Sequence, residues 1–170
     1  MVLLLWLYAT MRGIMIYKSC SFFGHRKLEL TEDEKTELKI ELYIILENLI
    51  KQGCEFFFFG GFGEFDEVCW QIATNLKQKF PDIKRIYCLA DENHLRPTKR
   101  PKYLKQEDYE EFVYFPLEYN YWYSRIYYRN CAMIDQSDIV IFYVEKRKES
   151  GAYKALEYAL RKKKEIINLI

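Results

Sequence analysis

The chain has 170 residues, half of them hydrophobic and 30% charged, which is the composition of a folded domain and excludes a disordered chain or a membrane bundle. Its formal charge of +1 excludes a global field that would draw the whole protein to nucleic acid or anionic lipid. Five scattered cysteines without a CxxC pair, and only two histidines, give no zinc-ligand spacing and no disulfide framework, so we expect a cytoplasmic protein without metal or cofactor.

The chain begins with an apolar run, MVLLLWLYAT, whose nearest charge, Arg12, follows it. A signal peptide carries its basic residues before the apolar stretch, and a bilayer span needs about 20 apolar residues. Residues 1–13 are therefore expected to be a poorly integrated extension, such as a translated upstream segment, or else an extra strand or an oligomer contact. A single domain is expected over residues 14–170.

The first part of this domain predicts alternating strands and helices. Residues 14–21 are apolar and β-prone. Thr31 precedes Glu34 at the capping-box spacing, and apolar residues then recur with helical periodicity until Gly53. The next expected elements are a buried strand over 55–59, a helix over 68–80 and a strand over 83–90.

The second part begins with a polar segment. Residues 91–111 contain two prolines and show no periodicity, so a long loop or lid is expected there. The later expected elements are a strand at 112–115, a helix at 122–134, a strand at 139–144, a helix along 152–160 and a strand at 166–170. Strands joined by crossover helices indicate an α/β fold, a Rossmann-like three-layer sandwich with a mainly parallel, doubly wound sheet. Ligands of such sheets bind at the carboxyl ends of the strands, near the topological switch point.

Two clusters of candidate residues follow the expected first and second strands. The first is Gly24, His25 and Arg26, in which the arginine could contact phosphate oxygens. The second is the turn Gly60-Gly61-Phe62-Gly63 with Asp66, running from a strand into a helix. Backbone N–H groups at such a turn can approach a phosphate, and Asp66 could cap the helix or accept a ribose hydroxyl.

Two further clusters lie near the fifth strand. Arg129 and Asn130 precede it, and Ser150, Gly151 and Ala152 open the last helix, so two helix N-termini could converge on one anion. Each cluster alone also fits a structural role, as a tight turn, a solvated arginine or a helix-surface ion pair. Their common position at one sheet edge favours a phosphate site.

Taken together and in order, these motifs resemble the SLOG superfamily, named for the DNA-processing protein DprA (Smf) and the Lonely-guy proteins, and within it small YpsA-like members. The matching segments are GHR beginning at Gly24, GGFGEFD beginning at Gly60, RN beginning at Arg129, SD at Ser137 and Asp138, and SGAYK beginning at Ser150. The resemblance runs from about Met15 to the C-terminus. It implies a Rossmann-like fold that binds nucleotides or nucleotide-derived ligands, often as a homodimer.

Three functions follow as alternatives. The first is a binding module in which phosphate rests on the 60–63 turn and the helix start at Gly151, with Arg26 and Arg129 as charge partners and a Tyr or Trp from residues 119–128 over the base. The second is a nucleoside-monophosphate N-glycosidase like the Lonely-guy enzymes, whose arginine corresponds to Arg129. Their catalytic glutamate lies in a PGGxGTxxE motif, from which this chain departs at residues 153–155.

In that second alternative, Glu64 or Asp66 would have to supply the carboxylate. The third alternative is single-stranded DNA binding by the basic residues of the 91–111 segment beside Tyr103. Those basic residues are Arg96, Lys99, Arg100, Lys102 and Lys105. No membrane partner is expected.

Overall fold

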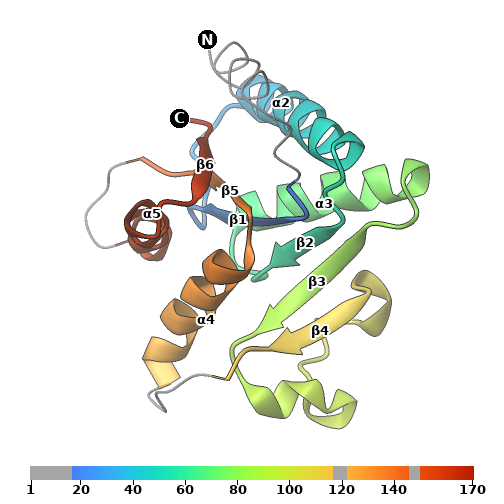
Figure 1. Ribbon diagram of the computed structural model, residues 1–170, viewed down its shortest axis with the longest axis vertical. Helices are drawn as coiled ribbons and strands as arrows, with labels where there is room; N and C mark the ends of the chain where they lie inside the picture. The colour runs from blue at the N-terminus through green and yellow to red at the C-terminus, as the bar shows by residue number, and fades with distance from the viewer. Residues whose placement is uncertain (1–16, 117–121, 146–149) are drawn as a thin grey trace.

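The computed structural model describes residues 17–116, 122–145 and 150–170 (Figure 1). Its six strands are β1 (Ser19–Gly24), β2 (Phe56–Phe59), β3 (Lys84–Leu89), β4 (Glu111–Tyr114), β5 (Ile139–Tyr143) and β6 (Glu165–Asn168). They form one sheet in the order β4-β3-β2-β1-β5-β6, with every neighbouring pair parallel. The chain winds outward from β1 in both directions, so the switch point lies between β1 and β5. The expected α/β, Rossmann-like fold is confirmed.

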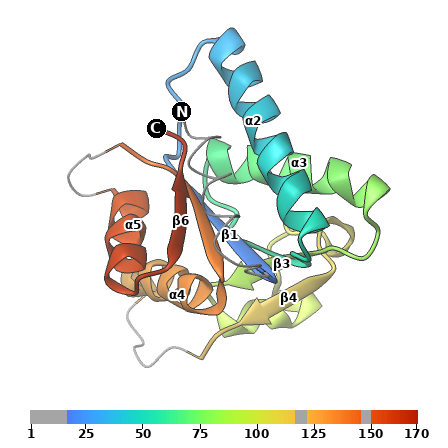
Figure 2. The same cartoon turned by 45° about the horizontal axis from the view of Figure 1, so that its top comes forward.

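Within the described residues, four helices cover the two faces of this sheet. They are α2 (Glu32–Lys51), α3 (Glu64–Lys79), α4 (Trp122–Gln136) and α5 (Gly151–Arg161). Helices α2 and α3 lie on one face and α4 and α5 on the other (Figure 2). Because both faces are covered, the central strands β1 and β5 are buried on both sides, which explains their continuous apolar runs. Phe22 and Phe59 stack under α2 and α3 with ring centroids 5.1 Å apart.

The start of α2 confirms the capping box. The Thr31 hydroxyl accepts the N–H of Glu34 at 3.3 Å, and the Glu34 carboxylate accepts the N–H of Thr31 at 2.7 Å. These bonds satisfy two of the N–H groups that a helix start leaves without partners. The periodic apolar residues that predicted the helix, Leu38, Leu42, Ile45, Leu46 and Leu49, are buried.

The entry to β1 is fixed by a residue from the far end of the chain. The Asp138 carboxylate accepts the N–H groups of Lys18 and Ser19 at 2.8 and 3.1 Å, and the Ser19 hydroxyl at 3.1 Å. The strand runs from Ser19 to Gly24, later than the expected 14–21, because its pairing with β2 begins at Ser19 and its pairing with β5 at Cys20. Residues 1–16, including the apolar extension, lie outside the described residues.

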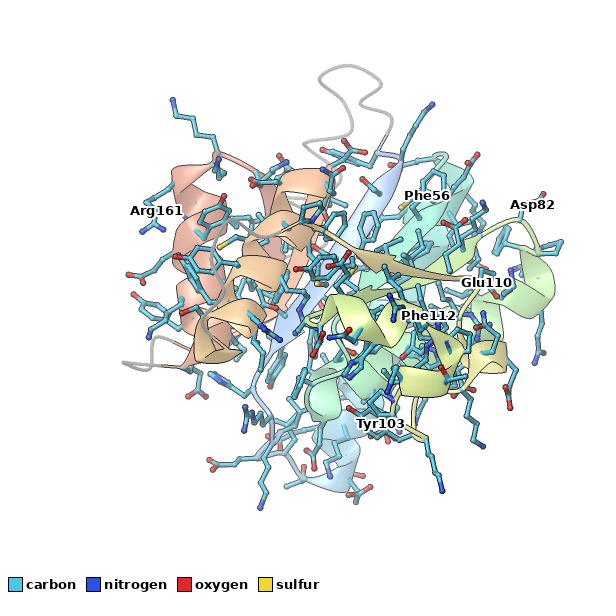
Figure 3. The ribbon with its side chains drawn as sticks, turned by 90° about the horizontal axis from the view of Figure 1, so that it is seen from below. Phe56, Asp82, Tyr103, Glu110, Phe112 and Arg161 are labelled. Carbon is cyan, nitrogen blue, oxygen red and sulfur yellow. The ribbon has the colours of Figure 1, made fainter. Side chains whose placement is uncertain are left out.

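The polar segment 91–111 is folded into three short 3-10 helices, at Glu92–Leu95, Pro97–Lys99 and Gln106–Asp108. The Arg100 guanidinium lies 3.6 Å from the centroid of the Phe112 ring and donates to the carbonyls of His94 and Leu95. Figure 3 shows Tyr103, Glu110 and Phe112 on this side of the molecule, away from Arg161 of α5. The segment packs against β3 and β4 and is an ordered cover of that sheet edge.

The described helices include none long and apolar enough to cross a membrane. All five cysteines are buried and free. Cys20, Cys54 and Cys88 occupy the core as the small apolar residues that their flanking sequence predicts.

Candidate functional site

A cavity of about 720 Å³ lies at the carboxyl ends of β1, β2 and β5, where the switch-point rule places ligands. All the candidate residues except Gly61 and Gly63 line this cavity. The candidates that line it are Gly24, His25, Arg26, Gly60, Phe62, Asp66, Arg129, Asn130, Ser150, Gly151 and Ala152. The lining residues that sequence reasoning missed are Phe22, Phe23, Lys27, Glu29 and Ile126. Lys27 and Glu29 closely follow the motif Gly24-His25-Arg26 in the sequence, and this closeness could have predicted that they line the same cavity. None of the 91–111 segment lines the cavity among the described residues.

The glycine turn after β2 is closed around its own carboxylate. The Asp66 side chain accepts the N–H of Gly61 at 2.9 Å and the N–H of Gly60 at 3.4 Å. These two N–H groups are among those that the sequence predicted to bind a phosphate. Asp66 therefore occupies, from within the chain, the position expected for the ligand anion at this part of the turn.

The backbone of this turn requires its glycines. Gly61 and Gly63 have φ of +70° and +102°, a region that side chains rarely adopt. A Cβ on Gly61 would lie 2.5 Å from the Tyr87 ring, and one on Gly63 would lie 2.7 Å from the Cα of Arg26. Gly61 and Gly63 thus shape the cavity wall without lining it, which accounts for the GGxG pattern by itself.

Burial governs the ionisation of Asp66. Desolvation raises the pKa of this carboxyl to about 6, opposed by the hydrogen bonds from Gly61 and Gly60 and by the positive charge of Arg129. A carboxyl with a perturbed pKa in a cleft is common at functional sites, although structural networks produce the same shift.

Arg129 is held in the floor of the cavity, with only 2% of its surface exposed. Its Nη1 donates to the carbonyls of Gly60 and Cys88 at 2.8 and 3.0 Å, and its Nε donates to the Asn130 side chain at 3.0 Å. Nη2 has no hydrogen bond to any described residue. These bonds tie α4 to the ends of β2 and β3 and leave one edge of the guanidinium for a ligand.

A second buried arginine shows a different arrangement. Arg85, at the opposite end of β3, donates through Nε and Nη2 to the Glu110 carboxylate at 3.1 and 2.8 Å, and through Nη1 to the Thr74 hydroxyl at 2.9 Å. Its charge is neutralised by a carboxylate, and its donors are satisfied within the fold. Arg129 instead donates its hydrogen bonds to neutral oxygens, and the nearby carboxyl on which its charge acts is that of Asp66 in the cavity wall.

The start of α5 forms the opposite wall. The Ser150 hydroxyl caps the helix by accepting the N–H of Tyr153 at 2.9 Å, and the Ser150 carbonyl accepts the N–H of Lys154. A Cβ on Gly151 would meet no atom within 4 Å, so this position opens into free space. The first amides of the helix, at Gly151 and Ala152, line the cavity with the positive end of the helix dipole.

The loop after β1 completes the rim. The Nε2 of His25 accepts the N–H of Glu145 at 3.2 Å, which links the segments that follow β1 and β5. The Glu64 carboxylate accepts the N–H of Leu28 at 2.7 Å and does not line the cavity, whereas Asp66 does. Arg26, Lys27 and Glu29 are exposed in this part of the lining, so the loop brings both cationic and acidic groups to the cavity. No cluster of metal-ligating side chains occurs within the described ranges.

The aromatic stretch proposed to cover a base is only partly described. Residues 119–121 lie outside the described ranges. Within the described side chains of this stretch, Ile126 lines the cavity. Phe62, from the glycine turn, also lines it, with its ring centroid 5.4 Å from the Arg129 guanidinium carbon. Phe22 and Phe23 line the cavity as buried residues, whereas Phe62 is an exposed aromatic side chain of the lining.

No protein-family model matches the chain, and no curated protein matches it by sequence. Solved structures share its fold, among them the following two. DNA processing protein A from Helicobacter pylori, described with a single-stranded DNA binding mode, aligns with a TM-score of 0.58 and 18% identity over 88% of this chain and 64% of that chain. The structural genomics target TM1055 aligns with a TM-score of 0.54 and 16% identity over 88% of this chain and 72% of that chain.

This chain thus spans less than two thirds of the DNA processing protein A chain. At these identities the likeness shows the fold alone. The fold shared with DNA processing protein A is the Rossmann-like fold that the sequence motifs imply.

Proposed function

We propose that the cavity binds a nucleotide or a nucleotide-derived small molecule, with its phosphate between the start of α5, Arg26 and Arg129. The observation that carries this proposal is that Arg129, whose Nη2 has no hydrogen bond to a described residue, lines one cavity together with Gly151 and Ala152 at the start of α5. A cavity of about 720 Å³ is within the usual range for small-molecule sites, about 300–1,000 Å³.

The hydrogen bonds of Asp66 refine where the phosphate lies. Since the amides of Gly60 and Gly61 already bind this carboxylate, a phosphate there would face a negative charge. We place it at the α5 side of the cavity, and the Phe62 ring against the base. The glycine turn then contributes shape and an aromatic contact more than phosphate-binding amides.

The test uses Gly151, where a side chain fits without strain. Nucleotides from a broad panel should raise the melting temperature of the wild type and of Gly151→Ala. Gly151→Glu should fold, because an acidic residue is favourable in a first helical turn, but its carboxylate should repel the phosphate and abolish the shift. Arg26→Ala should reduce the shift, and Lys99→Ala, remote from the cavity, should not. The proposal fails if no nucleotide shifts the wild type, or if Gly151→Glu shifts as the wild type does.

A hydrolytic function is the second candidate, favoured by the buried Asp66 in the cavity wall. This carboxylate would stabilise the oxocarbenium-like transition state of N-glycosidic cleavage. Release of free base from nucleoside monophosphates by the wild type, and its loss in Asp66→Asn but not in Glu64→Gln, would establish it. Binding without base release would leave the binding module as the function.

Single-stranded DNA binding is the third candidate, favoured by the fold shared with DNA processing protein A. Tyr103 is 71% exposed beside Lys99, Lys102 and Lys105, whereas Arg100 is engaged with Phe112. Stacking and phosphate contacts by these residues would give binding that falls steeply with salt. Salt-sensitive retention of single strands, lost in Tyr103→Ala with Lys102→Ala, would support this candidate.

We also propose a family relationship and a cellular compartment for the protein. The four motifs favour a small YpsA-like member of the SLOG superfamily, and the free buried cysteines favour a cytoplasmic protein. A homodimer, which the resemblance implies, is also part of the proposal.

A further inference from the structure

Asp66 places an acidic group in the wall of the cavity. It lies in the first turn of α3 with 6% of its surface exposed, and it lines the cavity together with Arg129. Its carboxylate accepts the N–H groups of Gly61 and Gly60 at 2.9 and 3.4 Å. An anionic ligand that enters the cavity therefore meets a negative charge beside the amides and the guanidinium that would attract it.

The cation that acts on Asp66 is Arg129, and an arginine side chain stays charged at every pH at which the protein is folded. The other titratable groups that interact electrostatically with Asp66 belong to α3, to β3 and to the segment before β4. Burial raises the pKa of each of these groups, so they stay neutral between about pH 5 and 8. They are Cys69, Tyr87, Cys88 and Tyr109. Within this set, Asp66 is the group whose charge changes near neutral pH.

Protonation of Asp66 changes what the cavity wall presents to an anion. Burial raises the pKa of this carboxyl to about 6, against the hydrogen bonds from Gly61 and Gly60 and the charge of Arg129. A proton that binds there removes the negative charge and turns one of the two oxygens into a donor. The Arg129 guanidinium, whose Nη2 has no hydrogen bond to a described residue, then acts on the ligand without a competing carboxylate.

We propose that Asp66 regulates the cavity by coupling anion binding to protonation, so that binding of an anionic ligand is accompanied by uptake of a proton from solvent at this carboxyl. The inference rests on the proposed function, because it concerns the same cavity. The coupling is reciprocal: protonation of Asp66 strengthens the binding of the anion, and the bound anion favours the protonated carboxyl by the same factor. The site therefore binds its anion more tightly as the pH falls.

His25 is a second titratable group of the cavity lining and has to be separated from Asp66. Its Nε2 accepts the N–H of Glu145 at 3.2 Å, so a proton on this nitrogen would replace that hydrogen bond. Histidine side chains commonly change charge near neutral pH, and a cationic ring at the rim would also attract an anion. A pH dependence alone does not identify the responsible group, and the test needs variants of both residues.

The first test measures the dissociation constant of sulfate between pH 5 and 8, from the amide signals of Gly151 and Ala152 in nuclear magnetic resonance spectra. Sulfate stays a dianion over this range, whereas a phosphate group titrates near pH ~6 and would add a pH dependence of its own. The wild-type constant should be about tenfold lower at pH ~5 than at pH ~8. In Asp66→Asn, which removes the charge at nearly the same size, the constant should stay near the low-pH value of the wild type throughout.

Two control variants separate Asp66 from its neighbours. Glu64→Gln removes a carboxylate of the same helical turn that accepts the N–H of Leu28 and does not line the cavity. His25→Gln removes the histidine of the lining. Both variants should keep the tenfold rise in affinity on acidification. Loss of the rise in His25→Gln with its retention in Asp66→Asn would overturn the inference.

The second measurement needs no variant and follows the carboxyl directly. The ¹³C signal of the Asp66 carboxyl, recorded against pH in the wild type, gives the midpoint of its titration. With saturating sulfate this midpoint should move upward by about one pH unit, which is the reciprocal of the tenfold change in affinity. A midpoint unaffected by sulfate, or a wild-type affinity independent of pH, would overturn the inference and leave the phosphate site in place. If the wild type bound sulfate at no pH, the proposed phosphate site would fail, and this inference with it.

Discussion

Two glycine-containing helix starts face each other across the cavity, and the structure uses them differently. The α3 start is filled from within, because Asp66 binds the amides of Gly60 and Gly61 and no space remains for a Cβ at Gly61 or Gly63. The α5 start is open, because Ser150 caps the helix and Gly151 meets free space. The comparison shows that glycine has two separate structural roles in a strand-to-helix turn. At the start of α3 it permits a backbone conformation with positive φ, and at the start of α5 it leaves open space in the cavity wall.

The largest expected effect breaks the closed turn. Gly63→Ala should lower the free energy of unfolding by about 3 kcal/mol, because alanine is strained at this φ and its Cβ would press on the backbone of Arg26. Urea denaturation followed by circular dichroism measures this change. A loss below about 0.5 kcal/mol would show that the turn rearranges at little cost.

The carboxylate in the closed turn makes stability depend on pH. Because burial raises the pKa of Asp66 to about 6 from its ordinary value of 3.8, the folded state retains a proton that the unfolded chain releases. The contribution of this group to the free energy of unfolding is therefore highest below pH ~4 and falls by about 3 kcal/mol as the pH rises through 6. The difference in stability between wild type and Asp66→Asn should change by that amount between pH 4 and 7, measured by urea denaturation at each pH. A difference independent of pH would contradict this assignment.

A smaller effect is expected at Arg129, which lines the cavity between the two helix starts. Arg129→Lys retains the charge but not the planar group that reaches the carbonyls of both Gly60 and Cys88. We expect a loss of about 1–2 kcal/mol in stability and a weaker nucleotide-induced shift. In Arg85→Lys the stability should also fall, while the nucleotide-induced shift stays at the wild-type value. Equal losses of that shift in both variants would show that it reports stability and not the site.

The smallest effect has the opposite sign. Gly151→Ala should raise the free energy of unfolding by about 0.5–1 kcal/mol, because the position has room for a Cβ and the unfolded chain loses freedom. The same thermal and urea measurements that show damage in Gly63→Ala should show this gain. A destabilised Gly151→Ala would mean that the open turn also depends on its glycine.

The sequence predicts the fold well because its signals are local. The capping residues at Thr31 and Glu34 and the apolar rows of the helices needed no knowledge of distant contacts. The 91–111 segment was harder to predict, because three short 3-10 turns leave no periodic pattern and are held by side chains such as Arg100.

The gathering of the candidate residues was predictable from the sequence, but their hydrogen bonds were not. Strand ends and glycines indicated one sheet edge, and most of the candidate residues line one cavity there. The bonds of Arg129 to the carbonyls of Gly60 and Cys88 span 69 and 41 positions of sequence, so no local pattern could reveal them. The hydrogen bonds from Gly60 and Gly61 to Asp66 could not be predicted either, because the same carboxylate could have capped the helix or accepted a ribose hydroxyl.

The hydrogen bonds of Asp138 to Lys18 and Ser19 at the start of β1 affect how the chain folds. The bond to Lys18 joins groups 120 positions apart, and the central strand cannot complete its pairing until β5 has been made. Contacts so distant in sequence slow folding, because a long loop must close before they form. During synthesis the segment from β1 to β4 emerges first with one edge of β1 unpaired, and the cavity is assembled only when β5 and α5 arrive. A ligand of this cavity therefore acts on the finished chain, and it stabilises the last step of assembly rather than the first.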